Sequence, residues 1–200
     1  MTALIEAAKA PDFPAEIVLV LSNSAEAAGL QRAEAEGIAT AVLPHKAFKG
    51  REAFDRAMTE RIEASGATLV CLAGFMRLLS PWFCAHWTGR LINIHPALLP
   101  SFRGLDTHAR ALEAGVKLHG ATVHFVIPEM DEGPIIAQAA VPVLDSDDEA
   151  ALAARVLRQE HRLYPLALRL VATGAVRMAE GKVISALGGD GDAALVAPAG

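Results

Sequence analysis

The chain has 200 residues, of which 52% are hydrophobic and 20% charged, and its formal net charge is −5. This length suits one domain built around a single core. The acidic balance, without a cluster of Lys and Arg, excludes a nucleic-acid backbone as the main partner, because that binding depends on neutralising phosphates. No apolar run reaches the roughly 18 residues of a membrane helix and no secretory signal is visible, so we expect a cytoplasmic protein without a membrane partner.

Short apolar runs alternate with segments of helical period along the first half of the chain. This alternation is the pattern of an α/β domain, and we expect a doubly wound, mostly parallel sheet flanked by helices. The chain opens on a helix over residues 1–9. Strands are then predicted over 16–21, 40–43, 68–72 and 90–94, and the intervening helices over 25–36, 50–65 and 80–87.

The second half begins with a loop that contains Pro96 and Pro100. Asp106 is expected to cap a helix that runs to Glu113, and Gly115 to close it. Two strands are predicted over 119–126 and 135–143, followed by a long helix over 147–171 with acidic residues in its first turn. We expect a domain over residues 1–187 and a disordered tail over 188–200.

Two polar motifs have the residue types of an acyl-transfer site, Asn93-Ile94-His95-Pro96 and Asp131-Glu132-Gly133-Pro134. The first falls at the end of a predicted strand, where open α/β sheets bind their ligands. Asn93 and His95 are two residues apart, so their side chains project to the same side and could converge on one oxygen. Each motif alone is also explained by ordinary turn chemistry.

The surroundings of the two motifs resemble those of the folate-dependent formyltransferases. The likeness is carried by Leu98-Leu99-Pro100-Ser101-Phe102-Arg103-Gly104 after the histidine and by His119-Gly120-Ala121-Thr122-Val123-His124-Phe125-Val126 before the aspartate. It extends over residues 1 to about 184 and implies a formyltransferase-like Rossmann-type fold. The implied activity is transfer of the formyl group of 10-formyltetrahydrofolate to the amino group of glycinamide ribonucleotide in purine synthesis.

The resemblance also implies roles for individual residues. Asn93 and a protonated His95 would hold the oxyanion, and Asp131 would support the imidazolium and assist proton transfer from the amine. Buried leucines or phenylalanines are more often core residues, and charges on helices are often merely exposed, so these alternatives stay open for the remaining positions. The implied folate-binding residues are Arg77, Leu79, Val126, Leu72, Phe83 and Leu91, and the implied nucleotide-binding residues are Arg51, Met76, Pro96 and Glu160.

The same reasoning sets expectations for metals, histidines and one proline. No metal is expected, because the spacing of His and carboxylates matches no common ligand motif, and the partners are the two small-molecule substrates of a monomer or homodimer. His108, His124 and His161 are interpreted as structural or at the rim of the pocket. The Leu99–Pro100 bond is predicted to be cis.

The family's first strand, with its glycine-serine-asparagine turn that binds phosphate through backbone amides, has no counterpart in the sequence. A sheet without its central strand would leave backbone groups unpaired and an apolar face exposed. We therefore expect the native start to lie upstream of Met1, and weak nucleotide binding if it does not.

Three other functions remain open. A formyltetrahydrofolate deformylase would use water as the acceptor, but that branch carries an additional N-terminal domain. A methionyl-tRNA formyltransferase would add a basic C-terminal domain that this chain lacks. A folate-binding protein without catalysis is the third alternative, and it would not depend on His95.

Overall fold

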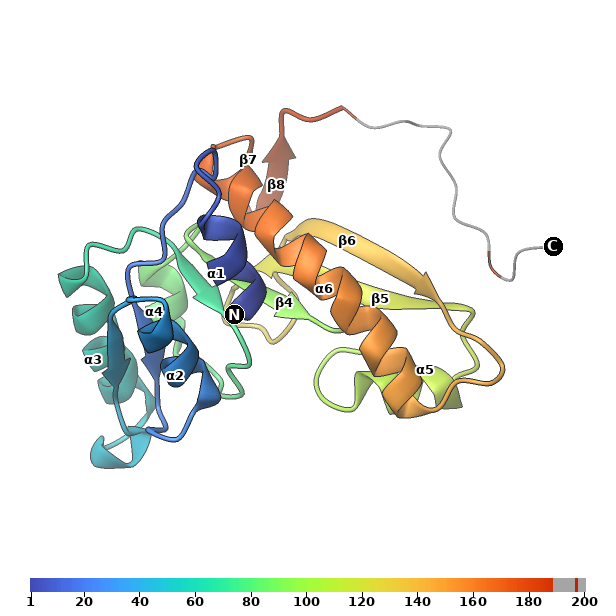
Figure 1. Ribbon diagram of the computed structural model, residues 1–200, viewed down its shortest axis with the longest axis horizontal. Helices are drawn as coiled ribbons and strands as arrows, with labels where there is room; N and C mark the ends of the chain where they lie inside the picture. Colours follow the sequence, from blue (N-terminus) through green and yellow to red (C-terminus); the bar gives the residue numbers. More distant parts are fainter. Residues whose placement is uncertain (189–196, 198–200) are drawn as a thin grey trace.

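The computed structural model describes residues 1–188 and 197, so the tail predicted for 188–200 lies almost wholly outside the described residues. Its alternating helices and strands confirm the α/β class (Figure 1). The elements are α1 (Thr2–Ala8), β1 (Val20–Ser22), α2 (Ala28–Ala35), β2 (Thr40–Val42), a 3-10 turn (His45–Ala47), α3 (Arg51–Ala64), β3 (Val70–Leu72), α4 (Pro81–His86), β4 (Leu91–His95), α5 (Thr107–Glu113), β5 (Leu118–Phe125), β6 (Ile135–Pro142), α6 (Glu149–Ala172), β7 (Val176–Ala179) and β8 (Lys182–Ser185).

The strands form three sheets, with the orders β1-β2, β3-β4-β5-β6 and β7-β8. Parallel pairing is confirmed for β1 with β2 and for β3 with β4. The other neighbours differ from the mostly parallel sheet that was expected, since β4 with β5, β5 with β6 and β7 with β8 pair antiparallel. One reason is that the loop over 126–134 joins β5 to β6 without the crossover that parallel neighbours require.

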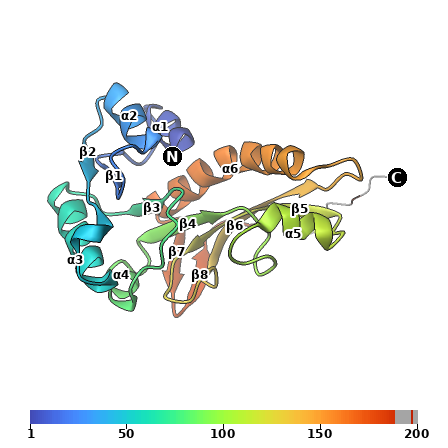
Figure 2. The same cartoon turned by 90° about the horizontal axis from the view of Figure 1, so that it is seen from below.

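Helices cover both faces of the four-stranded sheet (Figure 2). α1 and α6 pack on one face, where Ile92, Phe125 and Leu152 belong to one buried cluster. α3 and α4 contribute to a second cluster that contains Phe54 and Leu91. Because successive residues of a strand point to opposite faces, Leu91 and Ile92 of β4 enter different clusters and the sheet is buried on both sides.

β1 and β3 face a cavity instead of each other. The cavity has a volume of about 610 Å³ and is lined by residues 14–23 and 66–77, with side chains of α1, α3 and α6 above and below. Among the described strands, each of β1 and β3 is paired along one edge only. The strands predicted over 16–21 and 68–72 are accordingly shortened to Val20–Ser22 and Val70–Leu72, because the remaining residues have no neighbouring strand. This cavity is a slot that has the unpaired edges of β1 and β3 on its two sides.

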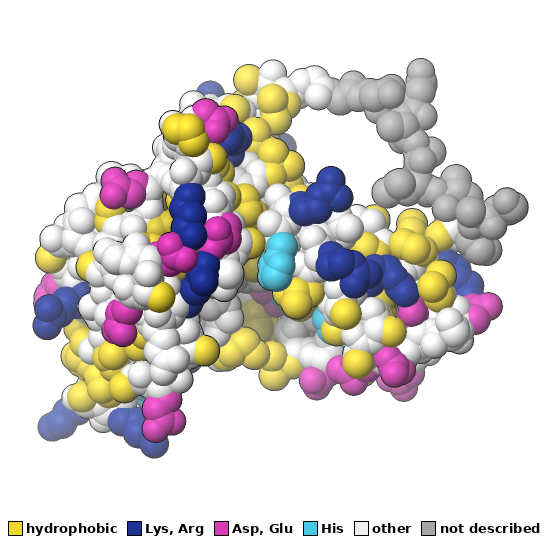
Figure 3. Space-filling model, in the orientation of Figure 1, with side chains coloured by type: hydrophobic (Ala, Val, Ile, Leu, Met, Phe, Trp, Pro, Cys, Tyr) yellow, Lys and Arg dark blue, Asp and Glu magenta, His cyan; other side chains and the backbone are white. Residues whose placement is uncertain are grey.

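Ion pairs join α1 to α2 on the surface beside this slot. Lys9 pairs with Glu6 at 3.1 Å and with Glu36 at 2.9 Å, and Arg32 pairs with both of these glutamates. Figure 3 shows the basic and acidic side chains intermixed on this part of the molecule, and a recess between the lobe that carries α2 and the half that carries α6.

Several local predictions can be compared directly with the structure. The Leu99–Pro100 bond is cis, as predicted. Asp106 does occupy the N-cap position of α5, but its side chain makes no capping hydrogen bond, because its backbone is left-handed with φ 54°. The β7–β8 hairpin was not predicted. In the structure its turn residues Glu180 and Gly181 both have positive φ, as a tight two-residue hairpin requires. Within the described residues, no helix is both long and apolar enough to cross a membrane.

Candidate active site

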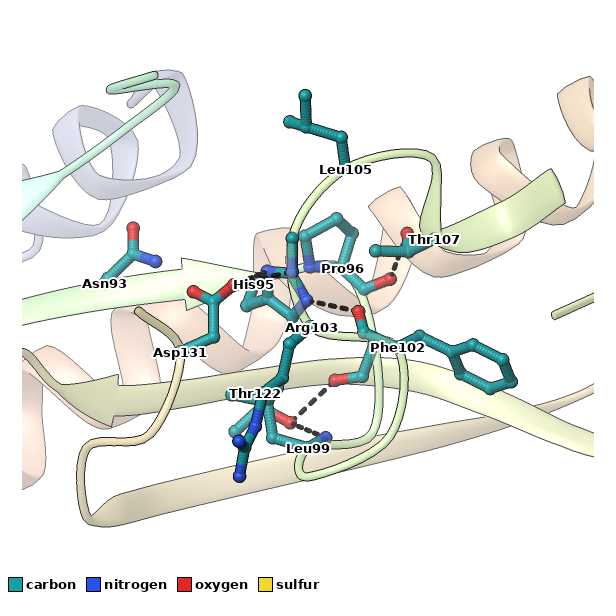
Figure 4. A network of polar contacts seen from close by, with 12 residues as sticks. Asn93, His95, Pro96, Leu99, Phe102, Arg103, Leu105, Thr107, Thr122 and Asp131 are labelled. Carbon is teal, nitrogen blue, oxygen red and sulfur yellow. Dashed lines mark hydrogen bonds and ion pairs between the residues drawn. The ribbon is translucent and has the colours of Figure 1, made fainter. Parts of the chain in front are cut away.

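Asn93, His95 and Asp131 lie together at the carboxyl end of β4 (Figure 4). The first two are alternate residues of that strand, and Asp131 comes from the loop between β5 and β6. Nδ1 of His95 is 3.6 Å from Oδ2 of Asp131, and both side chains are largely buried. The residues singled out in the sequence are therefore brought to one place, as their positions at strand ends suggested.

The two ring nitrogens of His95 face different groups. Nε2 lies 2.9 Å from the carbonyl oxygen of Phe102, and because a carbonyl can only accept, Nε2 donates to it. Nδ1 faces the carboxylate of Asp131, but the 3.6 Å separation exceeds a hydrogen bond. Nδ1 is therefore available to a ligand.

His124 orients the amide of Asn93. Nδ1 of His124 donates to the carbonyl of Phe125 at 2.8 Å, which leaves Nε2 as an acceptor for Nδ2 of Asn93 at 3.4 Å. Burial lowers the pKa of His124 and keeps the ring neutral, against smaller opposing effects of the Phe125 carbonyl and Asp131. The amide nitrogen of Asn93 has two hydrogens, so one remains for a ligand.

The loop after β4 is fastened to the sheet by a polar network. The hydroxyl of Thr122 donates to Ala97 O at 2.7 Å and accepts from Leu99 N at 3.0 Å. Nε2 of Gln138 donates to Leu99 O at 2.9 Å and to the Thr122 hydroxyl at 3.0 Å. Further along the loop, the amide of Gly104 donates to Oδ2 of Asp131 at 2.9 Å. Sequence reasoning missed Thr122, Gln138 and this amide.

The loop that carries Asp131 requires a glycine two residues later. A Cβ on Gly133 would lie 1.7 Å from the carbonyl oxygen of Phe125, which no side chain can occupy. The close approach lets the amide of Phe125 bond the carbonyl of Pro134 at 2.9 Å. Asp131 itself has a φ of 56°, in the left-handed region. The Asp-Glu-Gly-Pro motif thus turns sharply enough to bring its carboxylate back over β4.

Comparison with known proteins identifies the family. The model of the family described as formyl transferase matches residues 1–168. The chain belongs to the formyl transferase family. It is 48% identical to the phosphoribosylglycinamide formyltransferase of Escherichia coli over 180 residues, 90% of this chain and 85% of that protein. The solved phosphoribosylglycinamide formyltransferase of Brucella melitensis is 59% identical, with a TM-score of 0.82 over 86% of this chain and 88% of the other.

The chain also matches part of much longer formyl transferase relatives. It is 50% identical to the trifunctional purine biosynthetic protein adenosine-3 of Bos taurus over 180 residues. These are 90% of this chain but only 18% of that protein. The chain thus corresponds to a small portion of the trifunctional protein, whereas it spans most of the bacterial enzyme.

The six implied folate residues of this formyl transferase lie in different surroundings. Leu72, Arg77 and Phe83 line the large cavity, and Val126 packs at the partly exposed margin of the second core cluster. Leu79, Phe83 and Leu91 belong to the buried part of that cluster, and Leu91 is wholly inaccessible. Their role as pocket walls stays a prediction.

The four implied nucleotide residues are more widely spread. Glu160 lines a smaller cavity of about 260 Å³ together with Ile94, the residue between Asn93 and His95. Burial raises the pKa of Glu160, against a smaller opposing effect of the chain's amino terminus. Met76 is exposed beside the large cavity, and the Pro96 carbonyl accepts from the hydroxyl of Thr107 at 2.8 Å. Arg51 is exposed at the start of α3 and lines neither cavity.

Two further histidines, His108 and His119, lie close together beside the loop that follows β4. His119 is wholly buried, and neither of its ring nitrogens has a hydrogen-bond partner. His108 packs against it at a ring separation of 5.3 Å, and burial lowers the pKa of both rings. Among residues 1–188 and 197, no group of three or more His, Cys, Asp or Glu side chains is arranged to hold a metal ion.

Proposed function

We propose that this chain transfers the formyl group of 10-formyltetrahydrofolate to the amino group of glycinamide ribonucleotide. The observation that carries the proposal is the meeting of Asn93, His95 and Asp131 at the end of β4. Membership of the formyl transferase family supports it, and so does the 48% identity to an enzyme named for this acceptor.

The three side chains suit the charges that arise in this reaction. A neutral amine attacks the formyl carbon, which leaves negative charge on the formyl oxygen and positive charge on the amine nitrogen. The free amide hydrogen of Asn93 and the Nδ1 proton of His95 are donors for that oxygen. Asp131 balances the imidazolium and takes the proton that the amine loses, directly or through a water, before the bond to the folate nitrogen breaks and that nitrogen is protonated.

We extend the proposal to binding and to the setting of the enzyme. The resemblance to folate-dependent formyltransferases implies folate contacts for Leu72 and Arg77, and Glu160 lines a cavity beside the catalytic strand. We propose the first two as folate contacts and Glu160 as a contact of the ribose hydroxyls. A Glu160→Gln variant should then raise the KM for the nucleotide and leave kcat nearly unchanged. We further propose that the enzyme acts in the cytoplasm as a monomer or homodimer.

The decisive experiment measures product formation with both substrates. Purified protein is expected to form the N-formylated nucleotide, detected by mass spectrometry, and His95→Ala to reduce kcat by about 10²-fold or more. His86→Gln is the control, because His86 lies on α4 and lines neither cavity.

Two results would contradict the proposal. Formate release that needs no nucleotide would favour the deformylase alternative. Folate binding without turnover, unchanged by His95→Ala, would favour the non-catalytic alternative.

A further inference from the structure

One peptide group next to the active site is bonded on both of its polar atoms. The carbonyl oxygen of Arg103 accepts from Nη1 of Arg110 at 2.6 Å. The amide of Gly104, which belongs to the same peptide group, donates to Oδ2 of Asp131 at 2.9 Å. An arginine on α5 is thereby connected to the proposed catalytic carboxylate through a single rigid peptide plane.

Arg110 also contacts the loop at Leu105 and Phe102. Nη1 also lies 3.2 Å from the carbonyl oxygen of Leu105, and the guanidinium lies 5.7 Å from the centre of the Phe102 ring. The contacts extend from residue 102 to residue 105, on either side of Gly104. Gly104 has a φ of 79°, a left-handed conformation that glycine adopts without strain. The loop can therefore turn its amide toward Asp131 while Arg110 holds both flanking carbonyls.

The orientation of the Asp131 carboxylate depends on this amide. Oδ2 faces Nδ1 of His95 (Figure 4). The same oxygen accepts from Gly104, while Oδ1 is 3.9 Å from Nε2 of His124. Without the Gly104 amide, the carboxylate could rotate between the two histidines. A donor bound to the carbonyl of a peptide group also polarises its N–H and strengthens it as a donor to an anion.

From this geometry we infer that Arg110 is a positioning residue. Acting through the peptide group between Arg103 and Gly104, it holds the Asp131 carboxylate turned toward His95. The inference rests on the proposed function for its effect on rate, but the geometry itself can be tested without activity. A second tie, the ion pair between Arg103 and Glu132 at 2.5 Å, joins the residues next to Gly104 and Asp131. Both of its side chains are substantially exposed, so it contributes little by itself.

The kinetic test compares Arg110→Gln with a matched control, Arg90→Gln. Arg90 also donates to a backbone carbonyl, that of His86 at 2.8 Å, and lies 4.8 Å from the centre of the Trp87 ring, but it belongs to a different part of the fold. Arg110→Gln is expected to lower kcat about tenfold and to leave both KM values within about twofold. Arg110→Lys should restore most of kcat, and Arg90→Gln should match the wild type.

The structural test follows the Gly104 amide proton by NMR. A strong bond to a carboxylate is expected to place this resonance downfield and to slow its exchange with solvent, and Arg110→Gln should shift it upfield and speed its exchange. An unchanged Gly104 resonance overturns the inference whether or not the protein is active. A kcat within twofold of the wild type, or a loss equal to that of Arg90→Gln, also overturns it. Absence of formyl transfer by the wild type contradicts the proposed function alone, and the NMR result then decides the positioning role.

Discussion

His119 should make the stability of the protein depend on pH, and His119→Leu should remove that dependence. The imidazole is 0% exposed, contacts the rings of Phe102 and His108, and has no partner for either nitrogen. Burial, with a smaller contribution from His108 and against an opposing effect of the Pro96 carbonyl, lowers its pKa from 6.5 to about 4. Leucine has a similar volume and no polar atoms, so the substitution leaves no polar group unsatisfied.

The direction in which stability changes with pH depends on whether the folded or the unfolded chain binds the proton. Above pH 6.5 the ring is neutral in both states, whereas between pH 6.5 and about 4 the unfolded chain takes up a proton that the folded chain does not. Stability that is present above pH 6.5 is therefore lost as the pH falls toward 4. At roughly 1.4 kcal/mol per pKa unit, this loss amounts to about 3 kcal/mol.

Urea denaturation at pH 7.0, 5.5 and 4.5 measures the effect. The wild-type free energy of unfolding, minus that of His119→Leu, should fall by about 2.5 kcal/mol between pH 7.0 and 4.5, because the folded-state pKa lies below the lowest pH measured. His161→Gln removes an exposed histidine and should keep the wild-type slope. A difference between wild type and His119→Leu that stays constant with pH would refute the reasoning.

Three further predictions concern the site, the sheet and the slot. Asn93→Ala should lower kcat by about 10²–10³-fold and leave folate affinity, measured by calorimetry, nearly unchanged; an equal loss of affinity would contradict a role in the transition state. Tyr164→Phe should lower the free energy of unfolding by about 1–2 kcal/mol in urea, because the buried hydroxyl lies 2.7 Å from Leu72 O and 3.1 Å from Ile92 O; an unchanged midpoint would oppose this. Fusing about five branched apolar residues ahead of Met1, with a linker long enough to reach the slot, should raise the Tm by supplying a partner to β1 and β3. The same fusion with prolines at alternate positions should not raise it, and equal effects of both fusions would show that the slot takes no strand.

Features that depend on local sequence were predictable. Asn93 and His95 follow an apolar strand and Asp131 lies in a glycine-proline turn, so the sequence alone places both motifs at the edge of the sheet. The cis bond at Pro100 was predicted from its position directly after that strand. The hairpin turn at Glu180 and Gly181 also has a local signal, an isolated glycine between two short runs, but each run is only four residues long and too short to show a clear alternation.

Other features depend on residues that meet only after folding. Residues 16–19 have the composition of a strand but form none, because strand structure also requires a neighbour with free backbone groups. Arg110 looks like any exposed arginine on a helix, and only the folded loop shows that it bonds Arg103 O and Leu105 O. The connection of Gly104 to Asp131 spans two loops distant in sequence, which spacing alone cannot reveal.

The slot beside β1 also divides the molecule into regions of unequal local stability. β1, β2 and α2 pack on one another and meet the rest of the chain through α1 and through Leu21, which packs against the cluster of Phe54. The ion pairs of Lys9 and Arg32 beside them are exposed and contribute little free energy. Local opening of residues 20–42 should therefore cost less than global unfolding. Amide hydrogens of β1 and β2 should exchange with deuterium well before those of β4 and β5, so the proposed catalytic strand would remain protected while the neighbouring lobe opens and closes.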